Sequence, residues 1–457
     1  MRHLLFGTDG VRGEANRPPM TVETGVALGR AIAHSLRHGK KHPKILIGKD
    51  TRLSCYLFEH ALAAGICAVG GEAYLMGPMP TPGVAFLTVS MRAEAGVMIS
   101  ASHNPFQDNG IKFFGRDGFK LNDDLEEQIA GWIQTRATSS FDVTGKDIGK
   151  AYRVRDVLGR YVVYLKSTFP RSMSLEGLKI CVDCAHGAAY RLAPMVLEEL
   201  GAEVIAMGVS PDGTNINDQR GALHPSALQA RVIEEGAHLG IALDGDADRC
   251  LLVDEKGTLV DGDKILGMGA TWLKERGELS GDAVVATVMS NLGLEKALEA
   301  QGIAMNRCAV GDRFVVQALR EKNLVLGGEQ SGHLIFLNHA TTGDGMGTAL
   351  QMIAQMVESG KPLSELANFY EPFPQTIRSI RVSRKVPIAQ LEKTTKAIKE
   401  SETSLGSEGR VVVRYSGTEK KVRVMVEAVD NDKLIKSVDR ISDALISELV
   451  DPTEMAI

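Results

Sequence analysis

The sequence has few cysteines and no long hydrophobic run. Six cysteines in 457 residues are too sparse for a disulfide scaffold, which agrees with a reducing compartment. No apolar segment approaches the length needed to cross a bilayer. The N-terminus, where Arg2 and His3 precede only the short apolar run 4–6, does not resemble a secretory signal. We therefore expect a cytoplasmic protein with no membrane partner.

A strong net charge and low-complexity tracts are absent as well. The net charge of −5 gives no reason to expect a nucleic-acid partner. Hydrophobic residues make up 44% of the chain and charged residues 24%, an ordinary globular composition that argues against long disorder. A chain of 457 residues is too long for one hydrophobic core, so we expect roughly three or four domains.

Two of the cysteines, Cys181 and Cys184, form a C-x-x-C pair within a predicted strand. Positions three apart on a strand point to opposite faces of the sheet. We therefore expect buried core thiols here and neither a metal site nor a redox pair.

The sequence does contain a repeated alternation of predicted strands and helices. Strand 44–50, helix 56–69 and strand 72–76 form the first series, and further series begin near residues 178 and 265. Continuous apolar strands separated by helices favour a parallel sheet that is covered on both faces. Ligands of such sheets bind outside the carboxyl ends of the strands.

The composition changes after Phe369, where three predicted strands alternate with two predicted helices. We therefore predict an α/β fold with four domains. Three similar α/β domains with mixed, mainly parallel sheets occupy residues 1–152, 153–255 and 256–368. A smaller C-terminal α+β domain occupies residues 369–457.

A serine-containing turn follows the apolar run Val97–Ile99, which has the character of a buried strand. We call residues 100–105, Ser-Ala-Ser-His-Asn-Pro, the serine loop. Pro105 disfavours helical geometry at Asn104, so the loop is expected to be extended or turned and to present its serines at the mouth of the sheet. By itself this pattern is also typical of an ordinary turn.

Three alternating aspartates in the segment 244–249, Asp-Gly-Asp-Ala-Asp-Arg, form a second candidate site, the aspartate loop. Asp244, Asp246 and Asp248 can converge on one point, where their charges repel unless a hard cation such as Mg²⁺ lies among them. An EF-hand loop is excluded because its sixth place needs glycine and holds Arg249, and because strands and not helices flank the segment.

Three further loops carry groups that suit a phosphorylated polyol. The glycine-rich stretch Phe6–Gly13 allows close approach of a ligand to the backbone. Glu and Ser in Gly328–His333 suit sugar hydroxyls. The segment Arg414–Glu419, with Arg423 nearby, suits phosphate oxygens, although basic residues at a strand end are often a solvated rim. Together with a metal and a serine, these loops indicate phosphoryl transfer on a sugar phosphate through a phosphoserine.

In order and spacing, these motifs resemble those of the α-D-phosphohexomutase superfamily over essentially the whole chain. Phe6–Gly13 and Pro211–Asn217 resemble the bacterial phosphoglucosamine mutase branch more than the phosphomannomutase/phosphoglucomutase branch. The resemblance implies four domains around a central cleft. It also implies conversion of glucosamine 6-phosphate to glucosamine 1-phosphate through a 1,6-bisphosphate, which supplies the UDP-N-acetylglucosamine pathway.

The resemblance also implies a role for individual residues of this chain. One Mg²⁺ per site would be held by Asp244, Asp246, Asp248 and Ser102, the phosphoryl carrier. The groups around the transferring phosphoryl would be Arg12, His103, Arg249 and Lys112, a candidate general base. Those that bind substrate would be Glu329, Ser331, His333, Arg414, Ser416, Gly417, Thr418 and Arg423. Glucosamine 1,6-bisphosphate would be the intermediate and activator, and a homodimer is possible.

Two positions depart from the family pattern, because Lys420 stands where proline is usual and Tyr415 is atypical. Other functions remain open at this point. The chain resembles phosphomannomutases and phosphoglucomutases of the same superfamily, and a metal-binding protein without catalysis would carry similar loops. A serine hydrolase is not supported, since no Gly-x-Ser-x-Gly surrounds Ser102.

Overall fold

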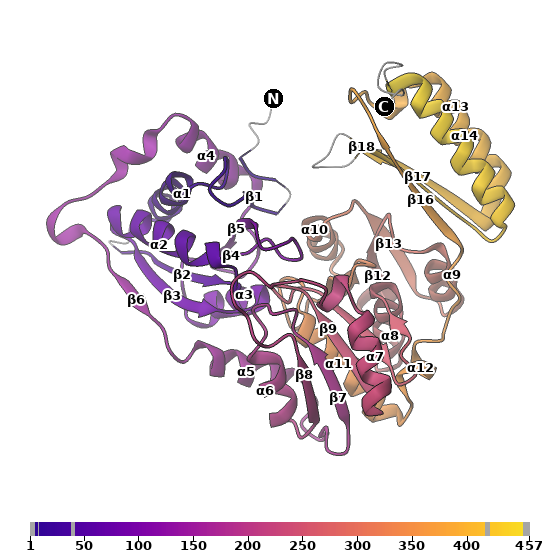
Figure 1. The fold of residues 1–457 in the computed structure, drawn as a ribbon, viewed down its shortest axis with the longest axis horizontal. Coiled ribbons are helices and arrows are strands. Elements are labelled where there is room, and N and C mark those ends of the chain that lie inside the picture. The colour runs from indigo at the N-terminus through magenta and orange to yellow at the C-terminus, as the bar shows by residue number, and fades with distance from the viewer. Residues whose placement is uncertain (1–4, 8, 38–41, 416–420, 451–457) are drawn as a thin grey trace. The chain divides into compact units, whose positions relative to one another are not determined.

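The computed structural model describes residues 5–7, 9–37, 42–415 and 421–450 (Figure 1). The chain divides into two compact units. Unit 1 contains Met1–Thr287 and Cys308–Asn368, and unit 2 contains Val288–Arg307 and Phe369–Ile457.

The first sheet of unit 1 is mixed, with six strands in the order β1-β5-β4-β2-β3-β6. The strands are β1 (Val11–Glu14), β2 (Lys44–Lys49), β3 (Glu72–Pro78), β4 (Ala95–Ile99), β5 (Asp108–Gly115) and β6 (Ala151–Arg153). β2 is parallel to β3 and β4, whereas β5 is antiparallel to β1 and β4. The helices of this part are α1 (Val22–Ser35), α2 (Leu53–Ala68), α3 (Thr81–Ser90) and α4 (Asp123–Gln134).

Both faces of strand β2 are covered, which explains why its sequence is apolar without alternation. Ile45 and Ile47 belong to the same core cluster as Phe58 of α2. Gly48 faces the other side, where a Cβ atom would lie 2.4 Å from a side-chain methyl of Val84 in α3. The predicted helix-covered sheet is therefore confirmed.

The second sheet has five strands in the order β11-β10-β9-β7-β8. They are β7 (Lys179–Asp183), β8 (Glu203–Met207), β9 (Leu239–Leu243), β10 (Cys250–Asp254) and β11 (Leu259–Val260). β7 is parallel to β8 and β9, and β10 is antiparallel to β9 and β11. The helices here are α5 (Val157–Thr168), α6 (Leu192–Glu199) and α7 (Ser226–Glu235). Cys181 and Cys184 are free buried thiols, as predicted.

The third sheet contains β12 (Ala283–Thr287), β14 (Leu326–Gly328) and β15 (Leu334–Phe336). β12 is parallel to β14, which is antiparallel to β15. Its helices are α8 (Gly262–Glu275), α10 (Asp312–Lys322), α11 (Gly345–Ser359) and α12 (Leu363–Leu366). The elements that follow β12 in the chain are α9 (Leu292–Ala300) and β13 (Ala304–Cys308).

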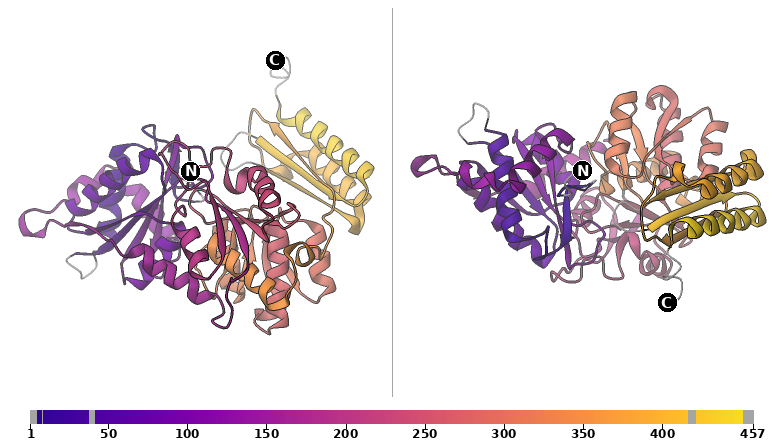
Figure 2. Two further views of the ribbon diagram at one scale, coloured as in Figure 1. Left: turned by 60° about the horizontal axis from the view of Figure 1, so that its bottom comes forward. Right: turned by 90° about the horizontal axis from the view of Figure 1, so that it is seen from above.

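Unit 2 contains an antiparallel sheet of β16 (Gln375–Arg381), β18 (Lys421–Ala428) and β17 (Gly409–Tyr415), in that order. Helices α13 (Glu392–Leu405) and α14 (Asn431–Leu449) cover one face of it (Figure 2). Val422, Val424 and Val426 alternate along β18 and enter a common core with Ile441 of α14. The predicted α+β character of this part is confirmed.

Several element boundaries differ from those predicted. The first helix was expected to end at Gly39, but α1 ends at Ser35, and residue 39 lies outside the described residues. Residues 310–314 were expected to be a loop, yet α10 begins at Asp312, whose carboxylate accepts the Arg313 N–H. Helix α3 was not predicted, because most of its residues are buried and its apolar residues show no clear helical period.

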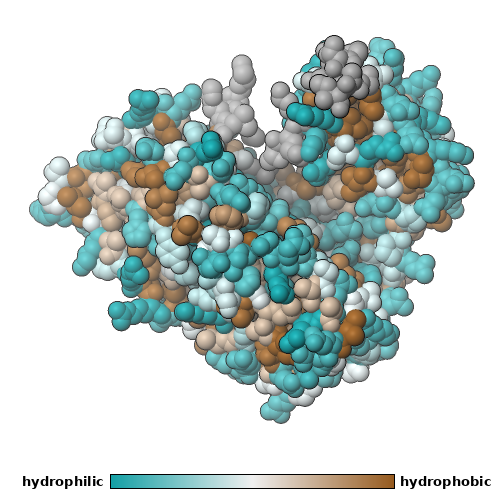
Figure 3. All heavy atoms as spheres, in the orientation of Figure 1, coloured by the Kyte–Doolittle hydropathy of each residue, from teal (hydrophilic) through white to brown (hydrophobic). Residues whose placement is uncertain are grey.

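On the face shown in Figure 3, hydrophobic residues lie in small separate groups among hydrophilic ones. The most exposed large hydrophobic side chains, Leu53, Val163 and Ile233, belong to three different helices. Within the described residues, every helix is too short or too polar to traverse a lipid bilayer.

Helices α1 and α2 cross so closely that only glycine fits at the crossing. A Cβ atom on Gly65 would lie 2.2 Å from the Val26 carbonyl oxygen, and one on Gly29 would lie 2.4 Å from the Leu62 carbonyl oxygen. We therefore predict that Gly65→Ala destabilises the protein by about 1–3 kcal/mol through overpacking, which calorimetry would record as a lower melting temperature.

Gly131→Ala is the matched control, since Gly131 lies in helix α4 with no atom within 4 Å of the added Cβ. It should raise stability by about 1 kcal/mol through helix propensity. A Gly65→Ala variant that melts at or above the wild-type temperature would contradict the packing described.

Candidate active site

The serine loop follows the end of β4 and is fixed by hydrogen bonds to buried groups. The Ser102 N–H donates to Ser100 Oγ at 2.8 Å, and the Ser100 hydroxyl donates to Asp50 Oδ2 at 2.6 Å. Ser102 is 1% exposed and has a φ of 52°, in the left-handed region that non-glycine residues seldom adopt. Such backbone strain is typical of functional sites.

The side chain of Ser102 faces the aspartate loop, which caps β9. Its hydroxyl donates to Asp244 Oδ2 at 2.6 Å, although the two residues are 142 positions apart. The structure therefore brings together the two loops that the sequence singled out.

The carboxylates of Asp244, Asp246 and Asp248 form a buried cluster in which one oxygen of each lies within 4.8 Å of the others. Burial, with the charges of Asp248 and Asp246, raises the pKa of Asp244 to about 8. Asp246 Oδ1 is buried and lacks a hydrogen-bond partner among the described residues. Three oxygen donors with spare acceptor capacity fit a hard divalent cation, so the cluster can hold a metal ion.

Lys112, on β5, is the main cation beside the cluster. Its Nζ lies 2.9 Å from Asp246 Oδ2, 3.2 Å from Asp9 Oδ2 and 3.4 Å from Asp248 Oδ2. Burial alone lowers the pKa of Lys112, but Asp246, Asp9 and Asp248 together raise it well above its ordinary value. The ammonium group therefore stays protonated at neutral pH.

Asp9 joins Arg12 and Lys112 into one charge network. Arg12, the second residue of β1, donates to Asp9, and Lys120 forms ion pairs with both Asp9 and Asp312. Sequence reasoning selected Arg12 and Lys112 but missed Lys120 and Asp312. Neither lies in a motif, and their roles depend on contacts between distant segments.

His103 and Arg249 flank the same site. His103 Nδ1 lies 3.4 Å from Ser102 Oγ, and burial together with the charges of Arg249 and Arg12 lowers the pKa of His103 to about 4. The Arg249 N–H donates to Asp244 Oδ1 at 3.3 Å, and its Nε lies 4.0 Å from an oxygen of Asp248. His103 is therefore neutral at physiological pH, while Arg249 adds positive charge.

The segment Gly328–His333 lies between β14 and β15. Glu329 Oε1 accepts the Gly311 N–H at 2.8 Å, and the Ser331 hydroxyl lies 3.4 Å from Glu329 Oε2. His333 Nδ1 lies 3.6 Å from Asp248 Oδ1, and its Nε2 accepts the Gly343 N–H at 3.1 Å. His333 is thus brought to the aspartate loop, whereas Glu329 binds the backbone before α10 and Ser331 contacts only Glu329 among these groups.

The predicted phosphate-binding residues belong to unit 2. Arg414 on β17 and Arg423 on β18 are direct partners in the strand register. Ser416, Gly417, Thr418 and Lys420 lie outside the described residues. The atypical Tyr415 anchors the strand, because its hydroxyl donates to the Val386 carbonyl at 2.6 Å and accepts the Val386 N–H at 3.0 Å.

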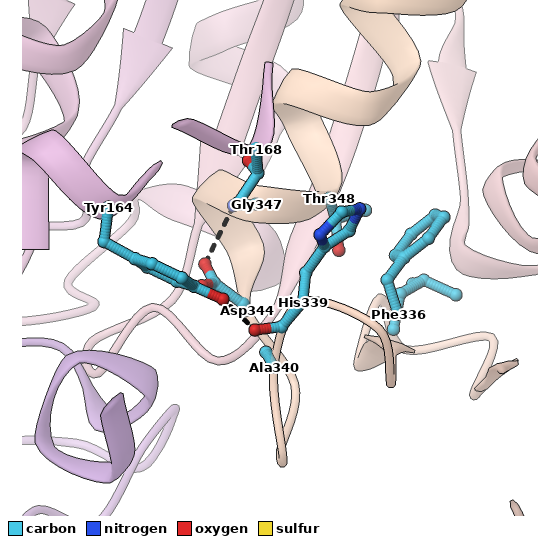
Figure 4. A pocket seen from close by; sticks show the side chains of 9 residues that line it. Tyr164, Thr168, Phe336, His339, Ala340, Asp344, Gly347 and Thr348 are labelled. Atoms are coloured by element: carbon cyan, nitrogen blue, oxygen red, sulfur yellow. Dashed lines mark hydrogen bonds between the residues drawn. The ribbon is translucent and has the colours of Figure 1, made fainter. Parts of the chain in front are cut away.

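The start of α11 supports the aspartate loop from the other side, since the Gly345 N–H donates to the Ala247 carbonyl at 3.0 Å. Asp344 caps this helix by accepting the Gly347 N–H at 2.8 Å, as Figure 4 shows. The pocket beside Asp344 has a volume of about 10 Å³, which is room for about one water molecule.

Comparison with known proteins assigns all parts of the chain to one family. The phosphoglucomutase/phosphomannomutase α/β/α domains I, II and III match residues 3–139, 159–257 and 261–373, and the C-terminal domain matches residues 379–444. Phosphoglucosamine mutase from Myxococcus xanthus is 54% identical over 445 residues, 97% of each chain. That from Anaeromyxobacter dehalogenans is 54% identical over 460 residues, 98% of this chain and 99% of the other.

Solved structures share the fold at lower identity. A phosphoglucomutase/phosphomannomutase family protein from Burkholderia thailandensis has a TM-score of 0.80 at 24% identity and covers 98% of each chain. An Aspergillus fumigatus N-acetylphosphoglucosamine mutase, in complex with GlcNAc-6P and magnesium, has a TM-score of 0.66 at 16% identity and covers 96% of this chain and 95% of that one.

The fold, the matched domains and a buried serine facing three carboxylates define a phosphohexomutase of the phosphoglucomutase/phosphomannomutase class. Within that class, the chain is 54% identical to two phosphoglucosamine mutases over nearly its full length. It therefore belongs to the phosphoglucosamine mutase family.

If the aspartate loop binds a metal ion, Mg²⁺ should stabilise the folded protein. At a concentration 100 times its dissociation constant, one bound ion adds about 2.7 kcal/mol, and the melting temperature rises accordingly. The Asp248→Asn variant should lose this Mg²⁺-dependent rise, whereas Asp124→Asn, at an exposed position on α4, should keep it. A wild-type melting temperature that does not respond to Mg²⁺ would contradict the assignment.

Proposed function

We propose that this chain interconverts glucosamine 6-phosphate and glucosamine 1-phosphate through a phosphorylated Ser102 and a 1,6-bisphosphate. The observation that carries the proposal is the 2.6 Å hydrogen bond from Ser102 to Asp244, within a cluster of three carboxylates and beside the protonated Lys112. The relatives that are 54% identical, all phosphoglucosamine mutases, support the choice of an amino sugar.

The metal proposed for this site is Mg²⁺, held by Asp244, Asp246, Asp248 and an oxygen of the Ser102 phosphate. When bound, the ion neutralises charge on the transferring phosphoryl group. The clustered acceptors and the unpartnered Asp246 Oδ1 support this ligand set. The Asp244 carboxylate also accepts the hydrogen bond that orients the Ser102 hydroxyl.

The proposed reaction balances without a net proton acceptor. In the first half, the bond from Ser102 Oγ to phosphorus breaks, a bond to the sugar O1 forms, and the O1 proton ends on Ser102 Oγ. In the second half, the phosphoryl group on O6 returns to Ser102 Oγ, whose proton ends on the sugar O6. The bisphosphate turns around between the two halves and also serves as the activator.

The groups around the reacting atoms mainly supply positive charge. Lys112, Arg12 and Arg249 stabilise the oxygens of the transferring group, and His103 acts as a neutral partner of Ser102. The raised pKa of Lys112 supports a role as a fixed charge and argues against its suggested role as a general base.

For the remainder of the substrate we propose the residues that the family resemblance suggests. Glu329, Ser331 and His333 would bind sugar hydroxyls and the groups near them. The nonreacting phosphate would be bound by Arg414, Ser416, Gly417, Thr418 and Arg423. The pairing of Arg414 with Arg423 across two strands supports this, because like charges placed opposite each other favour an anion between them.

Other features of the chain also remain proposals. The division at residues 152, 255 and 368, a cytoplasmic location and a homodimer agree with the proposed function. Sedimentation of the purified protein would establish the oligomeric state.

The carrier role predicts that Ser102→Ala abolishes turnover. With a hexosamine bisphosphate activator present, wild type should gain the mass of one phosphoryl group, while Ser102→Ala should gain none and convert no glucosamine 6-phosphate. Ser139→Ala, an exposed serine, is the control and should behave as wild type. Full turnover by Ser102→Ala would refute the carrier role. Comparison of kcat/KM for the 6-phosphates of glucosamine, glucose and mannose would identify the preferred sugar.

The fixed-charge role of Lys112 predicts different results for two variants. Lys112→Met should lower kcat by about 100-fold or more, because charge stabilisation is lost. Lys112→Arg keeps the charge but cannot act as a base, so it should retain at least about tenfold more activity than Lys112→Met. Wild-type kcat should also show no rise between pH 8 and 10. Such a rise, together with equal loss in both variants, would instead support a general base.

A further inference from the structure

The segment Pro211–Asn217, one of the two that point to the phosphoglucosamine mutase branch, has no role in the chemistry described so far. The segment follows β8 and contacts helix α2, whose first residue, Leu53, donates its N–H to the Gly213 carbonyl at 2.8 Å. At its end, Asn217 is 7% exposed, has a φ of 61°, and donates its N–H to the Ala185 carbonyl at 2.9 Å. Its backbone is therefore held firmly in place.

The side chain of Asn217 reaches the serine loop. Its Nδ2 lies 2.9 Å from the Ser102 carbonyl oxygen and 3.0 Å from the Asn104 carbonyl oxygen. Because both neighbours are acceptors, only the NH₂ group of the amide fits there. Asn217 thus binds the backbone of the residue whose hydroxyl faces Asp244.

Arg52 binds the same two carbonyl groups. Its Nη2 lies 2.8 Å from each of the Ser102 and Asn104 oxygens, and its Nη1 donates to the Pro105 carbonyl. Arg52 is fully buried and is itself held by Asp50 at 2.9 Å. Each of the two carbonyl oxygens therefore accepts one donor from Arg52 and one from Asn217, which matches its two lone pairs.

The aspartate loop packs tightly against the Ser102 carbonyl group and the side chain of Asn217. A Cβ atom on Gly245 would lie 2.6 Å from the Ser102 carbonyl oxygen, 2.8 Å from Ile216 Cδ1 and 2.9 Å from Asn217 Nδ2. Gly245 directly follows Asp244. These close contacts therefore help to fix the distance between Ser102 Oγ and its acceptor, Asp244 Oδ2.

We propose that Asn217 is a positioning residue for phosphoryl transfer, one that holds Ser102 in its left-handed conformation and aims Oγ at Asp244. The proposal rests on the proposed function and assigns a role to the segment Pro211–Asn217. Loss of the amide donor leaves Arg52 alone on the two carbonyls, and the strained loop then relaxes away from the aspartates. A small displacement of a reacting group lowers the rate of the chemical step more than it lowers affinity for the substrate.

The test compares Asn217→Asp with Asn215→Asp in the full chain. Asn217→Asp exchanges the NH₂ donor for an oxygen that the two carbonyls repel. Asn215→Asp makes the same chemical change in the same segment, where the Asn215 side chain donates to the exposed Ser210 carbonyl and accepts the exposed Asp212 N–H, away from the serine loop. Steady-state kinetics and hydrogen exchange of the peptide 100–106 are measured for both variants and for wild type.

We expect Asn217→Asp to lower kcat by about 100-fold with KM changed by less than about threefold, and to speed hydrogen exchange in the serine loop. Asn215→Asp should match wild type in both measurements. Wild-type kcat and exchange in Asn217→Asp, or equal losses in the two variants, would overturn the proposal. An inactive wild type would instead refute the proposed function, and hydrogen exchange would still decide whether Asn217 holds the loop.

Discussion

Mutual repulsion of three buried carboxylates is the constraint on which this site depends. With all three ionised, each pair of carboxylates, within 4.8 Å of one another, repels by about 3 kcal/mol or more at an effective dielectric constant of about 20, and burial together with this repulsion raises the pKa of Asp244 to about 8. Lys112 and the hydroxyls of Ser102 and Thr81 offset part of this cost, the latter by donating to Asp246 at 2.6 Å. The remaining imbalance favours a cation among the three carboxylates.

The fold satisfies this constraint by delivering the groups on separate loops. The serine loop leaves β4, the aspartate loop leaves β9, and Lys112 projects from β5 beside β4. Because each side chain follows or belongs to a buried strand, its backbone is fixed before any ligand binds. The site is therefore preorganised, as electrostatic catalysis requires.

The sequence allowed the fold class to be predicted, since strands and helices leave local patterns, whereas the pairing of Ser102 with the aspartates was implied by the resemblance to phosphohexomutases. The sequence did not reveal Lys120, Asp312 or the buried Arg52, whose partners are distant in the chain and whose neighbours form no motif. Lys112 shows a related limit. Motifs identify a residue, but its protonation depends on Asp9 and the other charges that folding places around it. Helix α3 was missed because most of its residues are buried, which weakens the helical period of apolar residues.

The most direct test of the central claim is a single-turnover experiment. Protein carrying one phosphoryl group on Ser102 is mixed, in excess, with glucosamine 6-phosphate and Mg²⁺, and the reaction is quenched at intervals. The account predicts that an ¹⁸O-labelled phosphoryl group placed on Ser102 moves to the sugar O1 at a rate no slower than kcat, while the unlabelled phosphoryl group from O6 replaces it on the serine-loop peptide. Formation of glucosamine 1-phosphate while Ser102 keeps its original phosphate would contradict it.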